Sequence, residues 1–503
     1  MKSRLFGILM FIETAALLAT ALVAWYYHVT LGEDDVRSFL IPAAITGTLG
    51  LVLFLFGRNR KMQFDADDTY VIVTISWVMF SVFGMLPFLL GGAVDNVTDA
   101  FFETMSGFST AGSTVLRDVD AQTHGILFWR SVIQWLGGLG IVVFTLAFVP
   151  SVARGGRNIS LFAAEAPGLS VEKLAPTMQG TSRILWGIYI LLTMLCAICY
   201  GLGPMDGFDA ICHALTTIAT GGFSTHQESI GYFHSSYIEY VCSAFMMLSG
   251  ISFSIYYFIA LRRFDVIKKN EELKVYLISI GLLTVLFIGL FRLAPRFDGV
   301  TAEQLASYPE RGEPAFRTAL FHVCSMLSNT GFMADGNYDQ WGLLFVIPTL
   351  LMQIVGGCAG SASGGVKIVR VMVIFKVIKN GLQELIHPTG IYKVKVSGQT
   401  VDEVTVRRVL HFFSLFVILL VLNMLVLSLV GMSLEDAVIA FLTCFSNLGM
   451  GSGATGPDAC FADLPTVSKW ILAFDMMVGR LEIVTVFLLI MRAPWRTVKS
   501  VRK

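Results

Sequence analysis

Four stretches of the chain align on a closing glycine: DAFFETMSGFSTAG (99–112), DAICHALTTIATGG (209–222), TALFHVCSMLSNTG (318–331) and DAVIAFLTCFSNLG (436–449). The closing glycines recur every 109 to 118 residues. Recurrence at a nearly fixed period indicates one structural unit used several times. The sequence therefore predicts four copies of a short apolar segment that ends in a small-polar-glycine turn.

The composition places these copies in a membrane. Of the 503 residues, 55% are hydrophobic and 14% are charged, and the mean hydropathy is +0.70. These values exclude a soluble domain and are typical of a polytopic membrane protein. Ten segments are long and apolar enough to cross a hydrocarbon core of roughly 30 Å. They are residues 5–27, 39–56, 69–90, 126–148, 184–202, 237–261, 273–291, 343–378, 409–430 and 470–491.

The basic residues predict the orientation. If both termini are cytoplasmic, 27 of the 36 Lys and Arg face the cytosol and only 7 face outward, as the positive-inside rule requires. The first span is too long for a signal peptide and is expected to be retained. The net charge of zero gives no reason to expect a nucleic-acid partner. The eight cysteines lie almost entirely in apolar segments, so they indicate no disulfide framework.

Each repeat has the order span, half-helix, glycine turn, span. The half-helix at 99–109 is about 15 Å long at 1.5 Å per residue, which is half a membrane, so it enters and returns on the same side. The predicted fold is all-α, with four such repeats around a pseudo-four-fold pore and two extra N-terminal spans. The expected units are 1–66 (the extra spans), 67–155, 156–265, 266–380 and 381–503, the last carrying a basic tail.

The half-helices are expected to point their C-terminal ends at the turns. Residues of N-cap type stand thirteen positions before each glycine: Asp99, Asp209, Thr318 and Asp436. Four helix C-termini, each with about half a negative charge, favour a cation where they converge.

The turns are expected to present backbone carbonyls to that cation, because a residue of positive φ lets successive carbonyls face one axis. No acidic or thiolate side chain occurs in them, which argues against a divalent or soft-metal site. The predicted filter residues are Thr110, Ala111, Gly112, Thr220, Gly221, Gly222, Asn329, Thr330, Gly331, Asn447, Leu448 and Gly449.

The eighth span is interrupted by a run of small residues, for which a helix is costly at about 1 kcal/mol per glycine. We interpret this run as an intramembrane gating loop, and expect only the third repeat to break fully. The predicted gate residues are Gly356, Gly357, Gly360, Ser361, Ala362, Ser363, Gly364, Gly365 and Arg480. Arg480 lies mid-span, where a charge is a functional candidate. The alternative for Arg480 is a structural pair with Asp475 or Glu482.

Other polar residues have simpler interpretations. Arg130 is expected to extend toward the membrane surface, and Lys367 to mark the cytoplasmic mouth. Glu103, His213 and His322 share one register of the half-helices and are expected to hold them, rather than to form a proton relay or a metal cluster.

The motifs FSTAGST, ATGGFST, SNTGF, GGCAGSASGGVK and VGRLEIVTV resemble those of the Trk/Ktr/HKT superfamily of potassium transporters, and most closely its TrkH branch. The resemblance covers essentially the whole chain, including the two extra spans. It implies that Gly112, Gly222, Gly331 and Gly449 are filter glycines, which favours K⁺, and that the third repeat has a gating loop with a pore-lining arginine. It also implies a homodimer controlled by a cytosolic ring of nucleotide-binding TrkA-like subunits. The sequence departs from the family's pattern in two turns. The fourth turn has Met450 where a proline is expected after the glycine, and the first turn has Ala111 and Ser113 at positions unusual for the family.

The sequence leaves three alternatives open. The first is a K⁺/H⁺ or K⁺/Na⁺ symporter on the same fold. The second is an intramembrane enzyme that uses the two half-helix histidines, which no nucleophile-base or metal-ligand spacing supports. The third is a regulatory membrane scaffold, which is disfavoured because the sequence contains no sizeable soluble domain. We expect a bacterial inner-membrane transporter in contact with lipid, without enzymatic activity and without a cofactor of its own.

Overall fold

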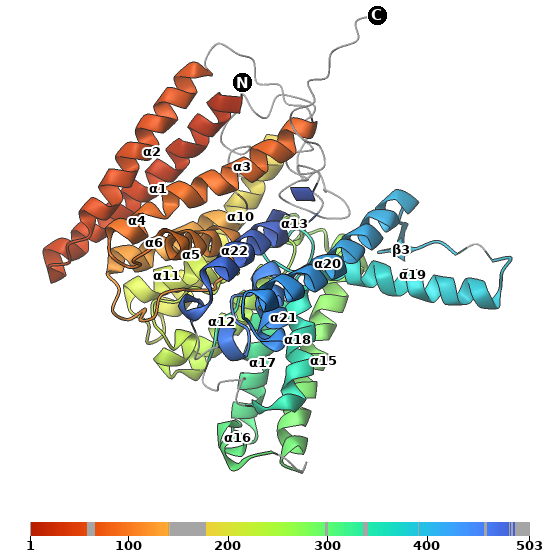
Figure 1. The fold of residues 1–503 in the computed structure, drawn as a ribbon. Coiled ribbons are helices and arrows are strands. Elements are labelled where there is room, and N and C mark those ends of the chain that lie inside the picture. Colours follow the sequence, from red (N-terminus) through yellow and green to blue (C-terminus); the bar gives the residue numbers. More distant parts are fainter. Residues whose placement is uncertain are drawn as a thin grey trace, which may run out of the picture.

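The computed structural model describes residues 2–57, 66–138, 140, 178–296, 300–334, 341–390, 392–456, 460–481, 483, 486 and 487. Over these residues the chain is a helical bundle with two short two-stranded sheets (Figure 1). Six helices there are long and apolar enough to cross a membrane: Ser3–Leu31, Val36–Phe56, Val71–Leu90, Gly180–Gly201, Glu271–Arg296 and Glu403–Leu429. They coincide with six of the ten predicted spans, and the protein is a multi-pass membrane protein.

Helices α1 (Lys2–Leu31) and α2 (Val36–Phe56) pack side by side at one edge of the bundle, as the two extra N-terminal spans (Figure 1). The helices that follow have the order expected for four repeats. The first contains α3 (Ala66–Gly84), α4 (Leu86–Leu90), the half-helix α5 (Val97–Ser109) and α6 (His124–Gly138). The second contains α10 (Met178–Gly201), the half-helix α11 (Gly207–Ile218), α12 (Ser236–Ser249) and α13 (Phe253–Ala260).

The later repeats keep the same order. The third contains α15 (Glu271–Leu293), the half-helix α17 (Glu313–Leu327), α18 (Leu343–Ile354) and α19 (Ile368–Ile386). The fourth contains α20 (Glu403–Leu429), the half-helix α21 (Leu434–Phe445) and α22 (Thr466–Leu481). Short helices α14 (Phe264–Lys269) and α16 (Ala302–Ser307) lie in connections.

The repeats close into a ring through one recurring contact. The helix that follows each turn packs against the half-helix of the next repeat: α6 on α11, α12 on α17 and α18 on α21. Helix α22 of the last repeat packs against α5 of the first. This order brings the four half-helices around a common centre.

The spans that follow the turns differ from the prediction. Repeat two is broken as well as repeat three, because α12 and α13 meet at a bend of 92° around Gly250. The expectation that only the third repeat breaks is therefore wrong. In repeat three, α18 ends at Ile354 and α19 begins at Ile368, with a short parallel pair, β1 (Val355–Gly356) and β2 (Val366–Lys367), on either side of the small-residue loop. Parts of the predicted spans 126–148 and 470–491 lie outside the described residues.

The segment 379–408, between the eighth and ninth predicted spans, contains ordered secondary structure. Helix α19 continues to Ile386 and projects from the bundle (Figure 1). It is followed by a hairpin of β3 (Lys395–Val396) and β4 (Gln399–Thr400).

Candidate functional site

The four glycine turns have the same backbone conformation. The first predicted residue of each turn takes a left-handed conformation, with φ of 60° at Thr110, 53° at Thr220 and 54° at both Asn329 and Asn447. The closing glycines also have positive φ, from 77° to 84°. Non-glycine residues adopt this region at a cost. Its recurrence at one position of all four repeats indicates that the turn conformation, rather than local preference, is what the chain maintains.

Hydrogen bonds close each half-helix in the same way. The amide of the left-handed residue donates three residues back, as from Thr110 N to Gly107 O at 3.0 Å, and the next amide donates five residues back, as from Ala111 N to Ser106 O at 2.8 Å. The corresponding pairs recur in the other three repeats at 2.9 to 3.2 Å. This double closure is the Schellman arrangement at a helix C-terminus. It directs the negative end of each half-helix toward its turn.

The turns contact one another in a closed ring. A Cβ atom placed on Gly112 would collide with the carbonyl oxygen of Gly221, and one on Gly222 would collide with that of Thr330. The same relation holds from Gly331 to Leu448 and from Gly449 back to Ala111. Each closing glycine thus packs against the carbonyl of the middle turn residue in the next repeat, and no larger residue fits there.

The predicted N-caps of repeats one, two and four are wrong by three residues, and that of repeat three is wrong by six. The caps are Asn96, Asp206 and Ser433, whose side chains accept hydrogen bonds from the amides of Asp99, Asp209 and Asp436. An acidic residue in the first turn also complements the helix dipole, and so it resembles a cap in sequence. In repeat three the cap position is Gly312, and Thr318 lies in the second turn of α17.

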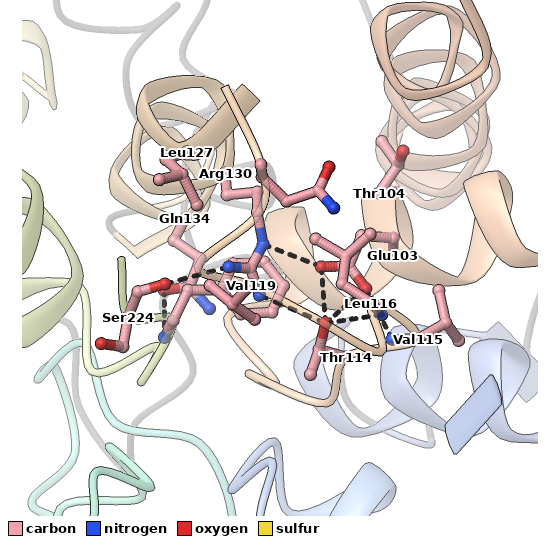
Figure 2. A network of polar contacts seen from close by, with 12 residues as sticks. Glu103, Thr104, Thr114, Val115, Leu116, Val119, Leu127, Arg130, Gln134 and Ser224 are labelled. Carbon is pink, nitrogen blue, oxygen red and sulfur yellow. Dashed lines mark hydrogen bonds and ion pairs between the residues drawn. The ribbon is translucent and has the colours of Figure 1, made fainter. Parts of the chain in front are cut away.

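A buried network links the half-helix of repeat one to the chain beyond its turn (Figure 2). The Glu103 carboxylate accepts hydrogen bonds from Thr114 Oγ1 at 3.0 Å and Val115 N at 2.9 Å, and pairs with Arg130 Nε at 2.9 Å. Arg130 also donates to Ser224 O at 3.0 Å in repeat two, and its guanidinium lies 4.1 Å from the Phe223 ring centre.

Arg130 is only 2% exposed, so the expectation that it extends toward the membrane surface is wrong. A buried guanidinium needs a carboxylate partner, and Glu103 comes from another helix. The neighbouring Gln134 holds the second turn directly: its Nε2 donates to Gly221 O at 2.7 Å and its Oε1 accepts from Phe223 N at 3.1 Å. Gln134 was missed because a single amide in a span carries no sequence signal.

The two half-helix histidines also form hydrogen bonds within the protein. His213 contacts Asp209 O through Nδ1 and Ser224 Oγ through Nε2, both at 2.9 Å. His322 Nδ1 contacts Thr318 O at 2.9 Å. No group of three or more His, Cys, Asp or Glu side chains suited to a metal ion occurs among the described residues.

The small-residue loop lies against the turns of repeats three and four. Ser363 Oγ donates to Asn329 Oδ1 at 3.0 Å and accepts from Gly357 N at 2.7 Å. A Cβ on Gly364 would collide with Ser446 O, and one on Gly356 would crowd Asn329 Oδ1. Lys367 is 8% exposed and donates to Ser363 O, so it closes the base of the loop rather than facing open solvent.

The same loop fills the break in repeat two. Cys358 N donates to Gly250 O at 2.9 Å, and Phe253 N donates to Gly360 O at 3.0 Å. A broken helix leaves a carbonyl and an amide without partners in its own ladder. The loop supplies both partners, which explains why repeat two can break inside the membrane.

Arg480 joins three repeats below the turns. From α22 it donates to Ala362 O of the loop at 2.8 Å, and to Gly137 O and Gly138 O at the end of α6 at 2.7 and 2.6 Å. Asp475, one alternative partner, accepts a hydrogen bond from Asn423 at 3.2 Å. Glu482, the other, lies outside the described residues.

Comparison with known proteins gives the family. The family model TrkH, described as a cation transport protein, matches residues 37–495. The chain belongs to the TrkH family. This membership confirms the predicted resemblance and the prediction of a transport protein rather than an enzyme.

Individual members of the TrkH family match the chain along nearly its full length. The Trk system potassium uptake protein TrkH of Escherichia coli is 33% identical over 98% of this chain and 99% of that protein. The Trk system potassium uptake protein TrkI of Halomonas elongata is 33% identical over 92% and 91%. The crystal structure of the potassium transporter TrkH from Vibrio parahaemolyticus superposes with a TM-score of 0.83, at 32% identity, over 98% and 99% of the two chains.

Proposed function

We propose that this protein carries K⁺ into the cell through the ring of four turns. The ring of glycines packed against carbonyls of the neighbouring repeats is the observation that carries the proposal. Carbonyl oxygens around a common axis can replace the water shell of a large monovalent cation, and four helix C-termini add negative potential there. The potassium uptake and potassium transporter names of the relatives agree with this ion.

The test is ⁸⁶Rb⁺ uptake by the full-length protein in lipid vesicles, with competing K⁺ or Na⁺ outside. We expect K⁺ to compete strongly and Na⁺ weakly, and most uptake to be lost when a ring glycine is changed to serine, because its Cβ would meet a carbonyl oxygen of the next repeat. Gly289, in the span α15 with open space at its α carbon, is the matched control for serine substitution. Equal competition by the two ions in the wild-type protein would contradict K⁺ selectivity.

We propose that residues 356–365 and Arg480 form the gate below this filter. The loop contacts Asn329 and Ser446 at two turns, and Arg480 ties it to α6 and α22. Removing 360–364 should increase Rb⁺ flux in protein that still folds. Unchanged flux in that deletion variant would remove the assignment.

A coupled K⁺/H⁺ symport has one observation in its favour. Asp475 is 2% exposed in α22, where the carbonyl of the next residue, Met476, accepts from the Asn447 side chain of the fourth turn. A carboxyl buried in a span is a candidate proton site. Flux that follows the K⁺ gradient alone at fixed proton gradient would favour a channel. Proton movement that stops in Asp475→Asn would favour symport.

The proposed assembly is a homodimer with both termini in the cytosol, bound by a TrkA-like nucleotide-binding ring. The projecting half of α19 supports an interface, since it exposes an apolar stripe at helical spacing: Phe375, Ile378, Leu382, Leu385 and Ile386. Size measurement of the purified protein in detergent, with Leu382→Glu as the disrupting variant, tests the dimer.

A further inference from the structure

Two consecutive acidic residues begin α15, and each holds a different segment. Glu271 Oε2 accepts from Lys376 Nζ of α19 at 2.7 Å and from Ser397 N of the β3–β4 hairpin at 2.8 Å. The Glu271 amide donates to Ser397 Oγ at 3.0 Å. Lys376 also donates to Lys395 O at 2.7 Å. The hairpin, α19 and α15 are therefore fastened together at Glu271.

The next residue holds the loop. Glu272 Oε1 accepts from Ala359 N at 2.7 Å, directly after the buried Cys358. The same carboxylate interacts with the positive charge of Lys367 and with the backbone amide of Val369. Consecutive helical residues point about 100° apart, so adjacent carboxylates at one helix end reach two separate elements.

Neither carboxylate is needed to cap the helix. Asn270 is the N-cap, and its side chain accepts from Leu273 N at 2.8 Å. Acidic residues at an N-terminus complement the helix dipole without specific partners. Here each one has a specific partner in another element, which dipole stabilisation does not require.

We propose that Glu271 and Glu272 couple the β3–β4 hairpin to the gating loop. Glu272 holds the loop closed at Ala359, and Glu271 makes the end of α15 follow the hairpin and α19. A protein that binds the hairpin and displaces it moves the first turn of α15, which withdraws the Glu272 carboxylate from the loop. The inference rests on the proposed gate and names two positioning residues for it.

Cys358 provides a readout of loop position that a purely structural role would not move. Its side chain is 1% exposed beside Ala359, and Cys358 N holds Gly250. A small thiol reagent can reach it only after the loop moves. The modification rate of Cys358, measured by mass spectrometry on its peptide in reconstituted full-length protein, reports loop release alongside ⁸⁶Rb⁺ flux.

The decisive variants are Glu272→Ala and Glu272→Gln. The alanine variant removes the acceptor, and we expect both the flux and the Cys358 modification rate to rise about tenfold. The glutamine variant keeps an oxygen for Ala359 N, and its change should be several-fold smaller. Glu403→Ala is the matched control. Glu403 likewise begins the first span of its repeat, directly after the N-cap Asp402, but its ion pair with Arg407 is long and lies on the surface.

Coupling is tested by combining variants. If Glu271 acts through Glu272, Glu271→Ala raises both readouts alone and adds nothing in the Glu272→Ala background. Additive effects, or no change in Cys358 modification in any Glu272 variant, would overturn the proposal. Glu272→Met serves if the alanine variant does not fold.

Failure of this inference and failure of the proposed function give different results. If deletion of 360–364 raises flux but the Glu272 variants do not, the coupling is wrong and the gate remains. If the deletion has no effect, the gate itself is wrong. If the wild-type protein carries no Rb⁺, the transport proposal fails before either question arises.

Discussion

The ring of turns and the loop below it use the four repeats in opposite ways. In the ring, every repeat contributes a left-handed residue at the same position, the same helix closure and the same glycine contact. The loop layer consists of the small-residue loop 356–365 and the segments that contact it. Here repeat three supplies the loop, and repeat two supplies the broken helix that binds it. Arg480 of repeat four connects the loop to repeat one. The ring is symmetric, whereas the layer below is not.

The proposed function explains this difference. A cation on the axis would be surrounded equally, so equal contributions from four repeats suit it. The proposed gate needs only one blocking segment, and the other repeats need only provide its partners. Substitutions in the ring should therefore have similar effects in all repeats, and substitutions in the loop layer should differ from repeat to repeat.

The ring predicts that each closing glycine is required. Gly331→Ala should abolish most Rb⁺ uptake, because its Cβ meets Leu448 O and its φ is +80°. The left-handed conformation alone costs about 1–2 kcal/mol for alanine. The same result is expected for Gly112, Gly222 and Gly449. Gly289→Ala, with open space around it in α15, should retain full uptake. Normal uptake in any one ring variant would show that the four contacts are not equivalent.

The buried Glu103–Arg130 pair lies beside the first and second turns, and we expect a large loss of stability when it is broken. Arg130→Ala leaves Glu103 buried without its charge partner, and the expected destabilisation is about 3–5 kcal/mol. The thermal unfolding midpoint in detergent measures it. Replacing both residues together with methionine and leucine should recover part of the loss. Arg407→Ala, which removes an exposed pair with Glu403, is the control and should leave the midpoint unchanged. A midpoint for Arg130→Ala equal to that of the control would contradict a structural ion pair.

The sequence predicts the parts of both layers that depend on residue type along the chain. The register of the four glycines and the run of small residues are visible because backbone conformation restricts which residues fit. The break at Gly250 was not predictable, since its partners Cys358 and Gly360 lie about a hundred residues away. Arg130 was misjudged for the same reason: its helical position is visible in sequence, but the carboxylate that meets it is not.

Variants of Arg480 distinguish two explanations of how the proposed gate stays closed. If Arg480 holds the loop by hydrogen bonds, Arg480→Ala and Arg480→Lys should both raise Rb⁺ flux and Cys358 modification, about tenfold for alanine. A lysine cannot reproduce the planar fork that reaches three carbonyl oxygens. If it acts only as a positive charge that repels the ion, the lysine variant should behave like the wild-type protein. Unchanged values in both variants would remove Arg480 from the gate.

The segment that follows the second turn contains His226, for which we expect a smaller, pH-dependent effect on stability. His226 lies between Asp120 Oδ1 at 2.8 Å and Asp209 Oδ2 at 3.1 Å, and its ring stacks on Tyr232. Burial alone would lower the pKa of His226, but the hydrogen bonds to Asp209 and Asp120 outweigh it and raise the pKa above its ordinary value.

Because the raised pKa favours the protonated form in the folded protein, His226 contributes stability fully below its unfolded pKa of about 6.5. That contribution is lost as the pH rises through the folded pKa. The thermal midpoint of the wild-type protein should therefore fall by about 1 °C more than that of His226→Asn between pH 6 and pH 9. Parallel pH profiles for the two proteins would mean that the contacts of His226 with Asp120 and Asp209 do not depend on its charge. The link between the first and second repeats at the mouth of the ring would then rest on neutral hydrogen bonds and on the stacking with Tyr232.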